Sequence, residues 1–316
     1  MSLRPSAFAA CLATFALAVA ACSDDETTAS PGTGDAGPAA TSDAGTTTDP
    51  TPTVDAGGDA GVAPARIRVA HLSPDAPAVR VCVTAKDGMF SANDTPATPS
   101  LSFKQISVYV PVPAGSYKAR IVAGDATNCG TALAAPFADV PLPAVAAGDV
   151  VTAAAIGKLS AIGSATGLTV AVLPDLPATP EAGKVHLRFF HAAPTTNIPV
   201  FVGVANGGNL AAALFSNVAF GKTDATLDGT KGFKPVDTAA TKARLGASAS
   251  ATGATVWASD AIAAAGLPDR TIRTVIAIDA ANATNAGDVD VLVVDDEAPG
   301  ANGLNDSAVV LPKLAN

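Results

Sequence analysis

The chain has few of the residues that most often perform chemistry or bind large ligands. Only 4% of its residues are aromatic, with one Trp and two Tyr, and it has three His and four Cys. It contains no Gly-x-Ser-x-Gly turn, no Walker-type phosphate-binding loop and no His-Glu-x-x-His zinc motif. Its one Gly-x-Gly-x-x-Gly match, Gly32–Gly37, lies in a low-complexity segment and does not follow an apolar strand. The common hydrolase, nucleotide-binding and zinc-protease classes are therefore not indicated. We expect a protein that is not an enzyme and that uses no cofactor.

Strong charge is missing from most of the chain. The net charge is −9, from 19 basic and 28 acidic residues. Eight of the acidic residues lie between residues 23 and 64, and Arg4 is the one basic residue before them, which leaves 18 basic and 20 acidic residues after residue 64. A nearly neutral body creates no field that attracts polyanions. The sequence predicts no nucleic-acid partner.

A short apolar segment stands at the N-terminus. Residues 8–19 are apolar, and Leu17–Cys22 resembles the small-residue site where a signal peptidase cuts before a cysteine that carries lipid. The segment is too short to span a bilayer as a stable helix. We expect residues 1–21 to be a lipoprotein signal peptide and Cys22 to anchor the protein to a bacterial membrane, outside the cytoplasm, with the outer membrane or cell surface favoured. The alternative is a plain secretory signal that is cut near Ala21 and releases the protein.

Residues 22–64 read as a disordered linker. They hold Asp, Ala, Gly, Thr, Ser and Pro, with no Lys or Arg and almost no large apolar residue. Such a segment cannot bury enough surface to offset the entropy of ordering it. The sequence predicts a flexible stalk between the lipid anchor and the rest of the chain.

The rest of the chain shows an internal repeat. Val69–Pro74 is matched 120 residues later by Phe189–Pro194, and in that register Arg68 falls on Arg188. The segments 168–175 and 289–296 also correspond. We expect two copies, 65–178 and 183–300, followed by a C-terminal tail at 301–316.

Each copy reads as all-β. Apolar runs of four to eight residues, rich in Val and Ile, alternate with Gly, Pro, Asn and Asp. The spacing predicts two tandem immunoglobulin-like β-sandwich domains. The expected strands of the second copy are 184–191, 198–204, 223–228, 272–278 and 288–294. An insertion at 230–243 carries interleaved Lys and Asp and is predicted to be a solvated loop.

Two motifs of the first copy resemble those of a known family. Arg66–Val79 reads as a strand that ends in His71 and runs into a Ser-Pro-Asp-Ala-Pro turn, and Pro113–Tyr117 reads as a Pro-Ala-Gly-x-Tyr hairpin. In both respects the chain resembles the bacterial family called domain of unknown function 4397. The second copy departs from it, because Thr195, Thr196 and Asn197 replace Asp-Ala-Pro. The resemblance implies a secreted or surface β-sandwich, often in tandem, and no known chemistry.

His71 and His191 occupy equivalent positions. A catalytic or metal role would need convergent partners, of which Asp75 is the only candidate beside His71. The simpler interpretation is that each histidine ring satisfies the backbone of the Pro turn that follows it.

Cys82 and Cys129 are the cysteines of the folded part. Outside the cytoplasm two such cysteines usually pair, so we expect a disulfide. The alternative is a buried thiol at Cys82, which is flanked by Val81 and Val83.

Oxygen-bearing side chains gather near the C-terminus. Asp295, Asp296 and Glu297 are weak candidates for Ca²⁺ ligands, since this ion prefers oxygen. The tight spacing of a calcium loop is absent, and a solvated loop is the favoured interpretation.

These features predict a cell-envelope lipoprotein that acts as a non-catalytic binding, adhesion or scaffold module. One alternative is an envelope enzyme directed at carbohydrate or peptidoglycan, which would place His71 or the Asp295 region in a cleft. Another is a purely structural spacer. A binding module would expose an apolar or aromatic patch, and four aromatic residues are its candidate members: Tyr109, Phe215, Phe220 and Trp257.

Overall fold

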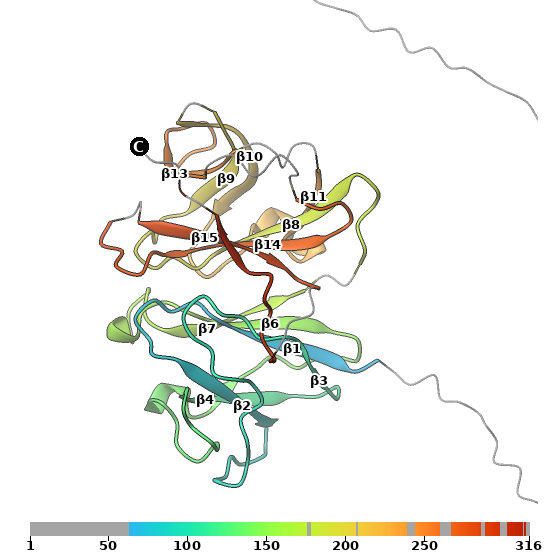
Figure 1. Ribbon diagram of the computed structural model, residues 1–316, viewed down its shortest axis with the longest axis vertical. Coiled ribbons are helices and arrows are strands. Elements are labelled where there is room, and N and C mark those ends of the chain that lie inside the picture. Colours follow the sequence, from blue (N-terminus) through green and yellow to red (C-terminus); the bar gives the residue numbers. More distant parts are fainter. Residues whose placement is uncertain are drawn as a thin grey trace, which may run out of the picture. The chain divides into compact units, whose positions relative to one another are not determined.

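Short apolar runs bounded by turn-forming residues become strands in both halves of the chain (Figure 1). The computed structural model describes residues 63–175, 178–206, 208–238, 244–259, 267–285, 288–297, 302–311 and 313. The predicted signal peptide, Cys22 and nearly all of the predicted linker lie outside the described residues. The described residues all belong to one compact unit.

The first half, up to residue 175, contains seven strands. They are β1 (Ala65–His71), β2 (Val79–Ala85), β3 (Val110–Val112), β4 (Tyr117–Ala123), β5 (Val140–Pro141), β6 (Val150–Ile156) and β7 (Thr169–Pro174). Two short 3-10 helices accompany them, η1 (Ala135–Phe137) and η2 (Leu159–Ala161).

The second half, from residue 178 on, contains the remaining strands. They are β8 (Lys184–His191), β9 (Val200–Asn206), β10 (Asn209–Val218), β11 (Phe233–Asp237), β12 (Arg244–Ser248), β13 (Thr255–Ala258), β14 (Ile272–Asp279), β15 (Val289–Asp295) and β16 (Val309–Leu311). One 3-10 helix, η3 (Ala225–Thr230), precedes β11.

The strands form four sheets. Each half has an inner sheet, with strand order β3-β1-β6-β7 in the first half and β11-β8-β14-β15-β16 in the second. Each half also has an outer sheet, with order β2-β4-β5 in the first and β10-β9-β12-β13 in the second. The fold is therefore all-β, with sheets in sandwich-like pairs, as the sequence predicts. The immunoglobulin-like arrangement is not confirmed, because β1–β6 and β8–β14 are parallel pairs inside the inner sheets, whereas the sheets of an immunoglobulin domain are antiparallel.

Three apolar layers lie between these four sheets. The first half packs Val69, Val81 and Ile121 between its own two sheets, and the second half packs Phe189, Val202 and their neighbours in the same way. The third layer lies between the two inner sheets and is shared by both halves (Figure 1). It comprises Ala70, Leu72, Ile106, Ala154, Ile156 and Leu173 from the first half and Phe190, Ala192, Ile276, Ile278, Leu292 and Val294 from the second.

The inner strands are buried on both faces. On β1, Val69 points into the core of the first half while Ala70 points into the shared layer. On β14, Val275 and Ile276 divide in the same way. Since successive side chains of a strand point to opposite faces, such strands need apolar residues at nearly every position. This accounts for the unbroken apolar runs in the sequence.

The segment after β15, which the sequence assigns to a tail, joins the two halves. Its strand β16 pairs with β15 of the second half. Just before β16, the amide of Val108 donates to the carbonyl of Gly303 (2.9 Å), and the amide of Asn305 donates to the carbonyl of Ile106 (2.7 Å). Leu304 packs against the core of the first half.

The predicted disulfide is confirmed. Cys82 on β2 and Cys129, in the loop after β4, are bonded, with their Cα atoms 6.0 Å apart. Both are buried beside Val122. The bond ties the outer sheet of the first half to the loop 124–134.

Two predictions for the second half are wrong. Residues 223–228 are not a strand but largely belong to η3, because the Asp224 side chain accepts the amide of Thr226 and starts a helical turn. The described part of the insertion at 230–243 is not a solvated loop: it holds β11, which pairs with β8 as an edge strand. Pro235 is tolerated there because an edge strand needs hydrogen bonds on one side only.

Candidate functional site

Each inner sheet has one buried arginine among the described residues. Arg68 lies on β1 and Arg188 on β8, and their side chains are 2% and 0% exposed. Both occupy the face of the strand that points into the shared layer, two residues before Ala70 and Phe190. A guanidinium at such a place needs a charged partner, because burying an unpaired charge is strongly destabilising.

The partner of each arginine comes from the other half. The Nη2 group of Arg68 donates to Oδ1 of Asp296 (2.5 Å), which follows β15 of the second half. The Nη2 group of Arg188 donates to Oδ1 of Asp175 (2.5 Å), which follows β7 of the first half. Each half therefore contributes one arginine and one aspartate, and both ion pairs cross between the halves.

Two threonines connect these pairs. Thr152 on β6 accepts from Nε of Arg68 (2.8 Å) and donates to Asp175 (2.7 Å). Thr274 on β14 accepts from Nη2 of Arg188 (3.0 Å) and donates to Asp296 (2.7 Å). Each arginine thus donates directly to the other half's aspartate and reaches its own half's aspartate through a threonine. Arg188 also lies within ion-pair distance of Asp296 in its own half (3.9 Å). We call these six residues the reciprocal network.

Aromatic rings cover both guanidinium groups. The ring centre of Tyr109 lies 4.7 Å from Cζ of Arg68, and that of Phe233 lies 4.4 Å from Cζ of Arg188. Such stacking favours a desolvated cation. The hydroxyl of Tyr109 also donates to Asp175 (2.8 Å), and burial, aided by Asp175 and Asp296, raises the pKa of Tyr109 against the opposing effect of Arg68.

The network keeps its charges. Burial opposes the charge on Asp175, but Arg188 and Arg68 outweigh it and hold the pKa of Asp175 below its ordinary value. Burial likewise opposes the charge on Arg68, and Asp296 and Asp175 outweigh it, so the pKa of Arg68 is raised. Two positive and two negative groups balance each other, so the network has no surplus charge with which to bind an ion.

The network also offers no reactive group. Both threonine hydroxyls donate to carboxylates, and both carboxylates are engaged by arginine. None of its six members lines the interior cavities of the two halves. Its arrangement can fix the two halves together in one register, and it has no accessible nucleophile or base.

Sequence reasoning missed this network, although its signal was present. The repeat already aligns Arg68 with Arg188 and places Asp175 and Asp296 at the ends of matching segments. A charged residue inside an apolar strand, at the same position in both copies, indicates a buried polar group with a dedicated partner. What the repeat does not reveal is that each arginine pairs with the aspartate of the other copy.

The histidines have the structural role that the simpler interpretation gives them. Nε2 of His71 lies 2.9 Å from the carbonyl oxygen of Pro77, and Nε2 of His191 lies 3.3 Å from that of Ile198. Asp75 does not orient His71, because its carboxylate accepts from the amides of Leu159 and Ser160 instead. Burial lowers the pKa of both histidines.

The acidic C-terminal residues do not converge on a cation site. Asp296 points inward to Arg68, while Asp295 pairs with Arg273 on the neighbouring strand (2.9 Å). Glu297 is exposed. Among the described residues there is no group of three or more acidic, His or Cys side chains placed to hold a metal ion.

The four aromatic candidates do not form an exposed patch. Trp257 and Phe215 are 3% and 2% exposed and belong to the core of the second half. Tyr109 stacks on Arg68, and Phe220 is partly buried against the shared layer. Aromatic residues are so scarce in this chain that the core and the network use all four.

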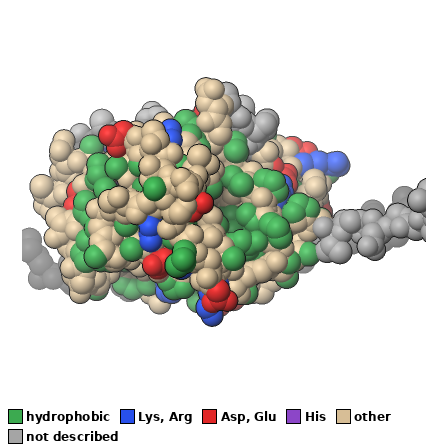
Figure 2. All heavy atoms as spheres, turned by 90° about the horizontal axis from the view of Figure 1, so that it is seen from below, with side chains coloured by type: hydrophobic (Ala, Val, Ile, Leu, Met, Phe, Trp, Pro, Cys, Tyr) green, Lys and Arg blue, Asp and Glu red, His purple; other side chains and the backbone are tan. Residues whose placement is uncertain are grey.

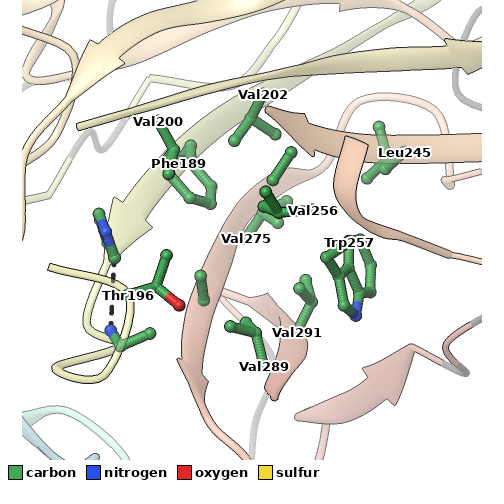
Figure 3. A pocket seen from close by; sticks show the side chains of 14 residues that line it. Phe189, Thr196, Val200, Val202, Leu245, Val256, Trp257, Val275, Val289 and Val291 are labelled. Atoms are coloured by element: carbon green, nitrogen blue, oxygen red, sulfur yellow. Dashed lines mark hydrogen bonds between the residues drawn. The ribbon is translucent and has the colours of Figure 1, made fainter. Parts of the chain in front are cut away.

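Each sandwich encloses a small apolar cavity. In the second half, Phe189, Val202, Val275 and Trp257 surround it from both sheets (Figure 3). The centre of a water molecule can occupy about 20 Å³ of this cavity. In the corresponding cavity of the first half it can occupy about 30 Å³. Such spaces have room for about one or two waters and not for a substrate.

Lipid attachment at Cys22 lies outside the described residues. Within the part of the chain that the structure describes, no helix is long and apolar enough to cross a membrane.

Comparison with known proteins finds a family model that matches part of the chain, and it says nothing about activity. No curated protein matches the chain. The matched family segment contains β3 to β8, with Thr152, Asp175 and Arg188 of the network and Tyr109, which stacks on Arg68. The family model described as Domain of unknown function (DUF4397) matches residues 85–200, which confirms the resemblance that the sequence motifs indicate.

Proposed function

We propose that this protein is a non-catalytic scaffold of the bacterial cell envelope. In this proposal Cys22 carries the lipid, residues 23–64 form the stalk, and the β body that follows holds a fixed shape beyond the membrane surface. The observation that carries the proposal is the reciprocal network, in which the buried charged groups serve to lock one half onto the other.

The chemistry of the remaining surface supports the same conclusion. The face shown in Figure 2 carries acidic and basic side chains in small, scattered groups. Below the surface, the buried rings of His71 and His191 are hydrogen-bonded to backbone carbonyls. An enzyme needs titratable groups that converge in a cleft, and the candidates that the sequence offered for such a site are paired, buried or dispersed.

The anchor is tested by replacing the lipid-bearing cysteine. Cells that make the full chain are labelled with a palmitate analogue and fractionated. We expect Cys22→Ala to abolish labelling and to release the protein from membranes. Cys11→Ala is the matched control, because Cys11 lies within the predicted signal peptide and should leave both unchanged. Labelled, membrane-bound Cys22→Ala protein would refute the anchor.

The scaffold role is tested with the released protein. The Cys22→Ala chain is incubated with isolated peptidoglycan and with envelope extract. We expect retention of an envelope component on the protein and no soluble sugar fragments by mass spectrometry. Released fragments would support the alternative of a carbohydrate- or peptidoglycan-directed enzyme. Absence of both retention and fragments would support the alternative of a passive spacer.

A further inference from the structure

The contact between the two halves has the pattern of a symmetric dimer. In a two-fold interface, residue i of one subunit contacts residue j of the other, and j contacts i in return. Here Arg68 contacts Asp296 while Arg188 contacts Asp175. Since Arg68 corresponds to Arg188 and Asp175 to Asp296, the two contacts are the same contact made twice.

The surroundings of the two contacts also correspond. Thr152 and Thr274 lie on β6 and β14, the strands that pair in parallel with β1 and β8. Matching strand positions fill the shared layer: Ala70 and Phe190, Ala154 and Ile276, Ile156 and Ile278, Leu173 and Val294. The inner face of each half therefore presents the same arrangement of a buried arginine, a threonine and an aspartate among apolar side chains.

We propose that the inner face of each half is an interaction surface for a second copy of the same fold. In this chain the other half supplies that copy within one molecule, and another molecule of the chain can supply it instead. In this proposal the inner faces hold the two halves together, and the covalent connection is not required for their association.

The network makes this surface selective. Packed on an ordinary apolar surface, Arg68 would lose Asp296 and remain a buried, unpaired charge, which is strongly unfavourable. Only a surface with a carboxylate at the position of Asp296 satisfies it. The first half itself carries such a carboxylate, Asp175, at the corresponding position, so the required partner is another copy of this fold.

The chain between the two halves can be cut without changing the inner face of either half. Ala178 and Thr179 are exposed and are not part of the shared layer. A protease recognition sequence is inserted between them in the full Cys22→Ala chain, which is cleaved after it has folded. We expect the cut protein to elute as one species with the mass of the uncut chain. Separate elution of the two fragments in native buffer would overturn the proposal.

The identity of the partner is tested by exchange. Cut protein grown in heavy isotopes is mixed with unlabelled cut protein, unfolded in denaturant and refolded by dilution. We expect native mass spectrometry to show hybrid complexes of one labelled and one unlabelled fragment. Fragments that refold without reassociating would refute recognition of a second copy.

A variant shows whether the reciprocal network carries the recognition. Arg188→Met in the cut protein should weaken the association of the fragments by roughly a hundredfold or more, the scale expected when a buried ion pair loses one partner. Lys184→Met is the matched control, because Lys184 lies on the same strand and pairs within its own half with Asp237. If both variants weaken the association of the fragments equally, or if neither weakens it, the reciprocal network does not carry the recognition. The exchange of unmodified fragments stands independently if Arg188→Met fails to fold.

Discussion

The inner sheets of the two halves resemble each other, whereas the outer sheets differ. The inner sheets place arginine, threonine and aspartate at matching positions. The outer sheet of the first half has three strands and is tied by the Cys82–Cys129 bond, whereas that of the second half has four strands and has Gly203 at the position that matches Cys82. The core of the second half also uses larger side chains, among them Phe189 and Trp257.

The loops that follow the inner strands differ as well. In the first half the carboxylate of Asp75 accepts from the loop after β6, at Leu159 and Ser160. In the second half the acid is at the end of β14, where Asp279 accepts from Thr195. Both halves therefore have a hydrogen bond at this place, but the accepting carboxylate follows β1 in the first half and lies at the end of β14 in the second. The arginine, threonine and aspartate of the inner faces are the same in both halves. Outside the network each half builds a similar arrangement from different residues.

The largest expected effect comes from breaking the network. Arg68→Met removes the arginine that donates to Asp296 and leaves only Arg188, 3.9 Å away, beside this carboxylate. Breaking a buried ion pair costs about 3–5 kcal/mol. For a body of this size we expect the melting temperature to fall by roughly 6–20 °C. Both halves should melt together because they share one apolar layer.

Calorimetry measures this change. Arg66→Met is the control, because Arg66 is exposed on the same strand and should change stability little. Two separate transitions, with the second half unaffected by Arg68→Met, would show that the halves are energetically independent.

The disulfide should act mainly on one half. It closes a sequence separation of 47 residues, and its loss through Cys82→Val with Cys129→Ala should cost about 2–4 kcal/mol. Hydrogen exchange, followed by mass spectrometry of peptides, should rise more in β2 and β4 than in β9 and β12. Equal acceleration in both outer sheets would contradict this expectation.

Acid should weaken the fold through its buried histidines. Burial holds the pKa of His71 and His191 below the ordinary value, so below about pH 6.5 the unfolded chain binds protons that the folded chain does not. The free energy of unfolding should therefore fall as the pH drops, by up to about 1.4 kcal/mol per pH unit for each histidine.

Urea unfolding between pH 7.5 and 5.5 tests this slope. His71→Gln and His191→Gln should each flatten it, whereas His186→Gln should change it less, because His186 is less buried. A slope that all three variants leave unchanged would refute the role of the buried rings.

The smallest effect should come from filling the cavities. Ala155 on β6 and Ala277 on β14 occupy equivalent positions, and each lines the cavity of its own half. Ala155→Val and Ala277→Val should each add about 1 kcal/mol of stability through the added methyl groups. A loss of stability in one half alone would show that its cavity cannot accept the larger side chain.

Sequence alone predicts the inner sheets well and the outer sheet of the second half poorly. The strands β1, β6 and β14 are rich in Val, Ile and Ala, and β8 holds Val, Leu and two Phe. All four are buried on both faces, so their apolar residues stand out. The ten-residue strand β10 was missed because three consecutive alanines give it low strand propensity. Its place is fixed by pairing with β9, a contact that local sequence does not encode.

The candidate site shows a similar division. The pairing of Cys82 with Cys129 and the role of the histidines follow from residue type and position, and both are confirmed. Burial of Trp257 and Phe215 could not be inferred, because it depends on the missed outer strands. The pairing of Arg68 with Asp296 depends on how one half packs against the other, and periodicity along a single strand carries no information about that.

The position of β1 determines how the body responds to pulling. A load carried by the residues before Ala65 enters β1 lengthwise, and β1 lies between β3 and β6 with hydrogen bonds to both. These bonds run across the strand, so they must shear together and cannot open one at a time. Arg68, on the same strand, passes the strain directly to Asp296. Tension therefore enters at a strand that is hydrogen-bonded on both sides, and it is shared at once with the second half.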